Sequence, residues 1–134
     1  MKILLAVLAG LIAGSIVNMA LIVIGPQLIP LPGGIDPTDP DSLAANIHLF
    51  ETRHFLTPWL AHALGTLVGA VVAVKVSGRS VLAYAIGAVF LLGGVMMVMD
   101  VDSPMWFDVA DLLGAYLPMA WLATRLTGQA DEPA

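Results

Sequence analysis

The chain has 134 residues, no cysteine and a formal net charge of −5. Hydrophobic residues make up 59% of it and charged residues 11%, whereas soluble domains contain about 45–50% and about 25%. This composition predicts a single transmembrane domain over residues 1–134. The acidic balance argues against nucleic-acid binding, which needs a basic surface. The missing cysteines exclude disulfides, thiolate catalysis and cysteine-ligated metal sites.

The first predicted element is a membrane span over residues 3–25, which follow Lys2 and are almost all apolar. A helix of this length can cross about 30 Å of hydrocarbon at about 1.5 Å per residue. A secretory signal peptide is the alternative, but the apolar run is long enough to favour an uncleaved helix. Gly10, Gly14 and Asn18 recur every four residues and therefore form one row on this helix.

Residues 26–57 form the long connection of the chain, and Pro26 is expected to end the first span. A short helix is predicted to begin at Asp41 or Ser42, as its cap, and to run to about His54. We expect this helix to lie at the membrane interface with its apolar face in the lipid. That face comprises Leu43, Ile47 and Phe50.

Three more spans complete the predicted bundle, so the chain is expected to form four transmembrane helices in two hairpins. Thr57-Pro58 and Ser103-Pro104 each place a capping hydroxyl before a proline, which is typical of a helix start. The polar tail at 127–134 is expected to be disordered. The three spans are predicted at about 58–76, 81–99 and 104–126.

The second span carries a strip of small residues at every fourth position. Such a strip lets another helix approach closely in lipid. We therefore expect the row of Gly10, Gly14 and Asn18 to pack against it. The strip comprises Ala61, Gly65, Gly69 and Ala73.

The charges predict the orientation of the bundle. Arg53 and most of the acidic residues fall on the side of the long loop. By the positive-inside rule, the protein is expected in the bacterial inner (cytoplasmic) membrane, with both termini in the cytoplasm and the loop at 26–57 in the periplasm. The basic residues on the cytoplasmic side are Lys2, Lys75, Arg79 and Arg125.

Several polar side chains are predicted at similar depths in the outer leaflet. Such groups are costly in lipid and are functional candidates for that reason. They could form a proton-handling or polar-ligand site that opens outward, in which a carboxylate would set the tautomer of a histidine. Alternatively, they could be hydrogen-bonded groups that only determine which helices pack together. The candidates are Asn18, His62, Thr66, Asp108, Asp111 and Tyr116.

A divalent metal site is a further hypothesis for the outer loop, where His48, Glu51 and His54 occur at intervals of three. Histidine with carboxylate favours zinc. However, helical positions six apart lie about 120° out of register, which spreads the three side chains. They could equally form the polar face of an interfacial helix. No other cofactor is predicted.

Two other metal-binding patterns have simpler explanations. Asp36, Asp39 and Asp41 lack the spacing of an EF-hand calcium loop, and turn or cap roles account for them. Thioether clusters with histidine can hold copper(I), but neighbouring methionines on a helix point in different directions and are common packing residues. The methionines concerned are Met96, Met97 and Met99, with Met105 nearby.

Three phrases resemble segments of small bacterial four-span membrane proteins of uncharacterised function: GSIVNMA at Gly14–Ala20, LAHALGTLVGA at Leu60–Ala70 and DLLGAYLPMAW at Asp111–Trp121. The resemblance would cover nearly the whole chain. It implies a four-helix architecture, and it supplies neither an activity nor functional residues.

We therefore predict an all-α protein in the lipid bilayer, without enzymatic activity, that has an outward-facing polar site for transport, channel-like conduction or ligand binding. A homo-oligomer or a partner membrane protein is expected, because so small a bundle needs further helices to form a conduction path. One alternative is a structural or accessory subunit in which the polar residues only fix packing. A second is a metal-dependent membrane enzyme that uses the outer histidine, glutamate and aspartate residues.

Overall fold

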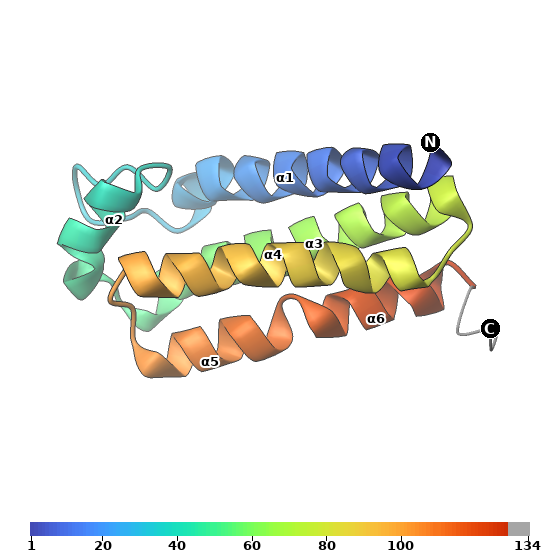
Figure 1. The fold of residues 1–134 in the computed structure, drawn as a ribbon. Helices are drawn as coiled ribbons and strands as arrows, with labels where there is room; N and C mark the ends of the chain where they lie inside the picture. Colours follow the sequence, from blue (N-terminus) through green and yellow to red (C-terminus); the bar gives the residue numbers. More distant parts are fainter. Residues whose placement is uncertain (129–134) are drawn as a thin grey trace.

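The computed structural model describes residues 1–128, which contain helices and no β-strand. Three helices are long and apolar enough to cross a membrane, and two shorter helices lie end to end beside them (Figure 1). The N-terminus, the end of α6 and the turn between α3 and α4 lie at one end of the bundle, and the long loop lies at the other (Figure 1). The bundle helices are α1 (Lys2–Leu28), α3 (Leu56–Ser77), α4 (Val81–Asp100), α5 (Met105–Gly114) and α6 (Leu117–Leu126).

The segment predicted as one span at 104–126 is two helices, each of 10 residues, with a break at Ala115 and Tyr116. Pro118 explains the break. It has no N–H to donate to the carbonyl of Gly114, and its ring would clash with that carbonyl if the helix were continuous. The break turns the side chain of Tyr116 into the bundle, where it is only 2% exposed.

The long loop is also divided differently from the prediction. The helix expected from Asp41 to His54 is replaced by a shorter helix and two 3-10 turns. Asp39 caps the helix, since its side chain accepts a hydrogen bond from the Asp41 N–H at 3.0 Å. Pro40 follows at the first helical position, where no N–H is needed. The elements are α2 (Pro40–Asn46), η1 (Ile47–Leu49) and η2 (Thr52–Phe55).

The apolar face of this loop contacts the bundle, so the expectation that it lies in the lipid is wrong. Leu43, Ile47 and Phe50 line a cavity together with side chains of α1, α4 and α5. An aromatic cluster anchors the loop: the ring centroids of Phe50 and Phe55 are 5.5 Å apart, and those of Phe55 and Phe107 are 4.7 Å apart. The loop therefore covers the end of the bundle (Figure 1).

The end of α1 and the start of α3 differ from the predicted boundaries by a few residues. α1 continues through Pro26 to Leu28. α3 begins at Leu56 and directly continues the preceding 3-10 turn. Of the tail predicted as disordered at 127–134, Thr127 is hydrogen-bonded to the end of α6, and residues 129–134 lie outside the described part of the chain.

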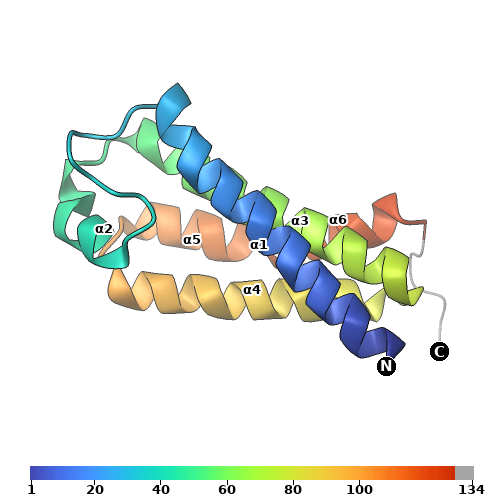
Figure 2. The same ribbon diagram turned by 90° about the horizontal axis from the view of Figure 1, so that it is seen from above.

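Helices α1 and α3 cross where both carry glycine, as the two rows of small residues predicted (Figure 2). A Cβ atom added to Gly10 would lie 2.6 Å from the carbonyl oxygen of Gly69. One added to Gly65 would lie 2.9 Å from the carbonyl oxygen of Gly14. Because these contacts are between backbones, no side-chain rotation could relieve them. The glycines thus set the distance between the two helices.

The interior near the turn between α3 and α4 is mainly apolar and tightly packed, with Ala70, Val74 and Ile86 fully buried. The buried hydroxyl of Thr124 on α6 donates to the carbonyl of Trp121. The outer surface is apolar too, which is unusual for a protein in water. In a lipid bilayer such a surface carries no penalty for exposing apolar side chains to water. Five of the outward-facing side chains are between 61% and 65% exposed: Leu4, Ile12, Ile16, Leu92 and Met96.

Candidate functional site

A hydrogen-bonded chain of three side chains lies near the loop end of the bundle. Asp111 of α5 is only 3% exposed. Its Oδ1 lies 2.8 Å from Nδ1 of His62 on α3, and its Oδ2 accepts a hydrogen bond from the Tyr116 hydroxyl at 2.9 Å. The rings of His62 and Tyr116 stack with their centroids 5.8 Å apart. Three segments of the chain are therefore joined at a single carboxylate.

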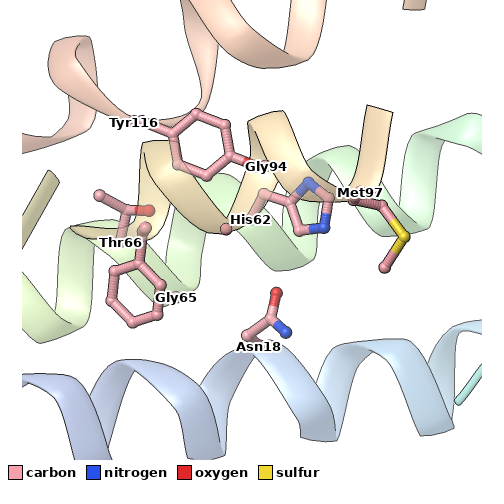
Figure 3. Close-up of a pocket in the computed structure, with 9 residues that line it drawn as sticks. Asn18, His62, Gly65, Thr66, Gly94, Met97 and Tyr116 are labelled. Carbon is pink, nitrogen blue, oxygen red and sulfur yellow. The ribbon is translucent and has the colours of Figure 1, made fainter. Parts of the chain in front are cut away.

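This arrangement determines which nitrogen of His62 is free. When Asp111 is ionised it can only accept hydrogen bonds, and Nδ1 of His62 is then the donor in this contact. In the neutral ring Nε2 then keeps its lone pair. His62 lies between Tyr116 and Asn18, with a ring nitrogen on the side of Met97 (Figure 3). The histidine thus presents an electron-pair donor of defined orientation.

Two features of the fold create the space that Tyr116 occupies. The break between α5 and α6 directs its side chain inward, and Gly94 of α4 leaves room for its ring. A Cβ atom added to Gly94 would lie 2.5 Å from the Tyr116 hydroxyl oxygen. The indole N–H of Trp59 donates to the carbonyl of Ala110 at 3.1 Å, which fixes α5 against α3 close to Asp111. The polar chain is therefore held by tight packing on both sides.

His62 faces a cavity of about 190 Å³. Thr66, one helical turn from His62, is 1% exposed, and its hydroxyl oxygen has no hydrogen-bond partner within residues 1–128. Asn18 of α1 closes the opposite wall (Figure 3). A buried hydroxyl without a partner is costly, so a bound molecule or water in this cavity would satisfy it. The other lining residues include Gly65, Phe90, Gly93, Gly94, Met97 and Tyr116.

A second cavity of about 170 Å³ lies between the first and the long loop. Asn18, His62 and Met97 line both cavities, so the two are neighbours with common walls. The outer cavity is also lined by five residues of the loop between positions 37 and 50: Pro37, Thr38, Leu43, Ile47 and Phe50. A route from the loop surface to His62 would therefore pass through it.

The structure brings together most of the residues predicted for the polar site. His62, Asp111 and Tyr116 are hydrogen-bonded to one another, and Asn18 and Thr66 line the adjoining cavity. Asp108 does not join them, because its Oδ1 accepts a hydrogen bond from the Ser103 hydroxyl at the start of α5. Helical spacing predicted that Asp108 and Asp111 share a face, but the hydrogen bond from Ser103 engages Asp108 instead.

The three residues of the hypothetical loop metal site do not converge. His54 is 3% exposed, and its Nδ1 accepts the Glu51 N–H at 2.8 Å. Glu51 pairs with Arg53 at 3.1 Å, and His48 is exposed. The helix ends before these residues, so their spacing of three no longer places them on neighbouring turns. No group of three or more histidine, aspartate or glutamate side chains in residues 1–128 is arranged to hold a metal ion.

Met97 is a cavity residue that the sequence did not single out from its neighbours. It is 37% exposed and lines both cavities, whereas Met96 is 65% exposed and Met99 80% exposed. A signal was present in the spacing. Met97 lies one turn beyond Gly94, and a glycine in a membrane helix often marks the face that packs inward.

Comparisons with protein-family models, with curated proteins and with solved structures found no match. The class of the protein therefore rests on the structure: an all-helical bundle in which three helices are long and apolar enough to cross a membrane. Any activity has to be inferred from the chemistry of the cavity itself.

Proposed function

We propose that the protein is a four-span protein of the bacterial inner membrane that binds a small ligand from the outside in the cavity next to His62, for transport or for ligand binding. The observation that carries this proposal is that His62 and Thr66 line one cavity. His62 is bonded to Asp111 through Nδ1, and the Thr66 hydroxyl has no hydrogen-bond partner in the described residues 1–128. Ionisable residues within membrane segments are functional candidates by default. In this proposal α5 and α6 together form the fourth span.

The distribution of charge supports an outward-facing cavity. The ends of the bundle differ in charge, with Lys75 and Arg79 at the turn between α3 and α4, and Asp36, Asp39 and Asp41 in the long loop. The positive-inside rule assigns the basic end to the cytoplasm. The cavity lies toward the loop and would therefore open to the periplasm.

The packing below the cavity favours a binding site with a single mouth. Ala70, Val74, Ile86 and Ala120, all fully buried, fill the interior on the cytoplasmic side. An ion crossing this region would lose its hydration without gaining polar partners. Transport would thus require a conformational change, or additional helices from a second copy or a partner membrane protein.

The alternative is an accessory subunit in which the polar residues only fix packing. It is favoured by one observation, namely that Asp111 joins His62 of α3 to Tyr116 at the α5–α6 break. In that case the cavity has no need to be reached from outside.

Cysteine labelling distinguishes the ligand-binding proposal from the accessory-subunit alternative, because the natural chain has no cysteine and each introduced cysteine is the single reactive thiol. We expect Met97→Cys to react with a charged, membrane-impermeant thiol reagent added to intact spheroplasts. Gly33→Cys in the loop should react as well, and Gly78→Cys only after permeabilisation. Met96→Cys, on the outer face of the same helix turn, is the matched control and should stay unlabelled.

The results also test the topology. Labelling of Gly78→Cys in intact spheroplasts would refute the proposed orientation. If Gly33→Cys reacts and Met97→Cys does not, the cavity is closed to the periplasm and the accessory interpretation is favoured.

A further inference from the structure

The geometry points to copper(I) as the ligand of this cavity, bound by Nε2 of His62 and the thioether sulfur of Met97, with Met19 as the third ligand. This inference rests on the proposed outward-facing cavity and names the class of ligand that the cavity takes. It assigns roles to two methionines that packing alone does not require.

His62 has the surroundings of a metal-binding histidine. Metal-bound imidazoles donate their other N–H to a carboxylate or carbonyl group, which sets the tautomer and raises the basicity of the ligating nitrogen. In this structure the carboxylate is that of Asp111, whose Oδ1 lies 2.8 Å from Nδ1 of His62. Its Oδ2 accepts a hydrogen bond from the Tyr116 hydroxyl at 2.9 Å. Nε2 is thereby left as the nitrogen for a ligand.

The methionines come from the two helices that face His62. Met97 of α4 lines both cavities together with His62, and Figure 3 shows both side chains at the first of them. Met19 of α1 lines the outer cavity, which His62 and Met97 also border. One nitrogen and two sulfurs would therefore reach the same space from three different helices.

The donor set and the charge select the metal. Thioethers are soft ligands that suit copper(I), whereas zinc requires further histidine, cysteine or carboxylate ligands. Within residues 1–128 no group of three histidine or acidic side chains could supply these. The three proposed ligands are neutral, and none of the described residues that line either cavity is an aspartate, glutamate, lysine or arginine. The carboxylate bonded to His62 is that of Asp111. A monovalent ion balances that charge, but a divalent ion would leave a net charge in an apolar interior, which is costly.

The test uses the full chain in detergent under anaerobic conditions, titrated with copper(I) against the chelator bicinchoninate. We expect one copper(I) per chain and no retention of zinc(II) in a parallel titration. Met97→Leu keeps the volume and removes the sulfur, so it should weaken binding by about 100-fold or more. Asp111→Asn should weaken it by about 10- to 100-fold, the usual cost of losing the partner of a ligating histidine. The matched control, Met96→Leu on the outward face of α4, should bind like the natural protein.

Failure to compete with the chelator, or equal affinities of Met97→Leu and Met96→Leu, would overturn the copper assignment. X-ray absorption at the copper edge of the natural protein is an independent readout that needs no variant. It should show nitrogen and sulfur scatterers, and an environment without sulfur would also overturn the assignment. If Met97→Cys is labelled from outside while copper does not bind, the cavity of the proposed function stands and only its ligand is wrong.

Discussion

The contact between α1 and α3 makes a strong prediction for the substitution Gly10→Ala. The added Cβ atom would lie 2.6 Å from the carbonyl oxygen of Gly69, 3.0 Å from Cβ of Ala73 and 3.1 Å from Cδ1 of Ile86. The isoleucine can rotate away, but the carbonyl oxygen belongs to the backbone of α3. The two helices must therefore move apart over the whole crossing.

The expected cost follows from two opposing effects. Overpacking of a close contact costs about 1–3 kcal/mol, whereas alanine is favoured over glycine within a helix by up to about 1 kcal/mol. We expect Gly10→Ala to lower the free energy of unfolding by about 1–2 kcal/mol. Gly93→Ala is the matched control, because a Cβ atom added to Gly93 meets nothing within 4 Å. This control should leave stability unchanged or raise it slightly.

Unfolding of the purified protein by sodium dodecyl sulfate in mixed micelles, followed by far-ultraviolet circular dichroism, measures both variants on the same scale. If Gly10→Ala and Gly93→Ala were equally stable, α1 and α3 would not be in contact at their glycines, and the proposed packing would be wrong.

Three further substitutions test other parts of the structure. Tyr116→Phe removes the hydroxyl that donates to Asp111 and should lower the free energy of unfolding by about 1–3 kcal/mol, since a buried carboxylate oxygen loses its partner; unchanged stability in the same detergent titration would refute the hydrogen bond. In the loop, hydrogen bonds from the side chain and then the backbone N–H of Thr38 hold the pKa of Asp36 below its usual range. The stabilisation of this turn is therefore present above the usual carboxyl pKa and is lost as the pH falls through the lowered pKa of Asp36. Thr38→Ala should raise the Asp36 pKa in a titration followed by nuclear magnetic resonance. Phe55→Ala removes a side chain that is 4% exposed and should cost about 3–5 kcal/mol; amide exchange in the loop should then accelerate, and unchanged exchange would show that the aromatic cluster does not anchor it.

The elements that the sequence predicted well are those with strong local signals. Long apolar runs predicted α1, α3 and α4, because a helix satisfies its own backbone hydrogen bonds whatever surrounds it. The repeat of small residues every four positions predicted the α1–α3 contact, which follows from helix geometry alone. Boundaries were less accurate where two signals compete, as at Pro26, which lies within the last turn of α1.

The loop and the second half of the bundle show where local signals fail. Asp39 and Asp41 are both suitable caps, and the choice between them depends on the position of Pro40. Burial of the apolar face of Leu43, Ile47 and Phe50 is favourable against lipid and against protein alike. The face contacts protein because the loop folds over the end of the bundle.

For the candidate site, the sequence by itself determined which polar residues occur at similar depths, because depth follows from a rise of about 1.5 Å per residue. It thereby placed Asn18, His62 and Asp111 at one level of the bundle, with Tyr116 as a residue that could reach them. Tertiary structure alone decided the rest. The break before α6 turns Tyr116 inward, and the hydrogen bond from Ser103 holds Asp108 away from Asp111. The rotation of α4 puts Met97 at the cavity while Met96 faces outward. Rotation about a helix axis depends on packing against other helices, and in a helix that is apolar on every side the sequence contains little information about it.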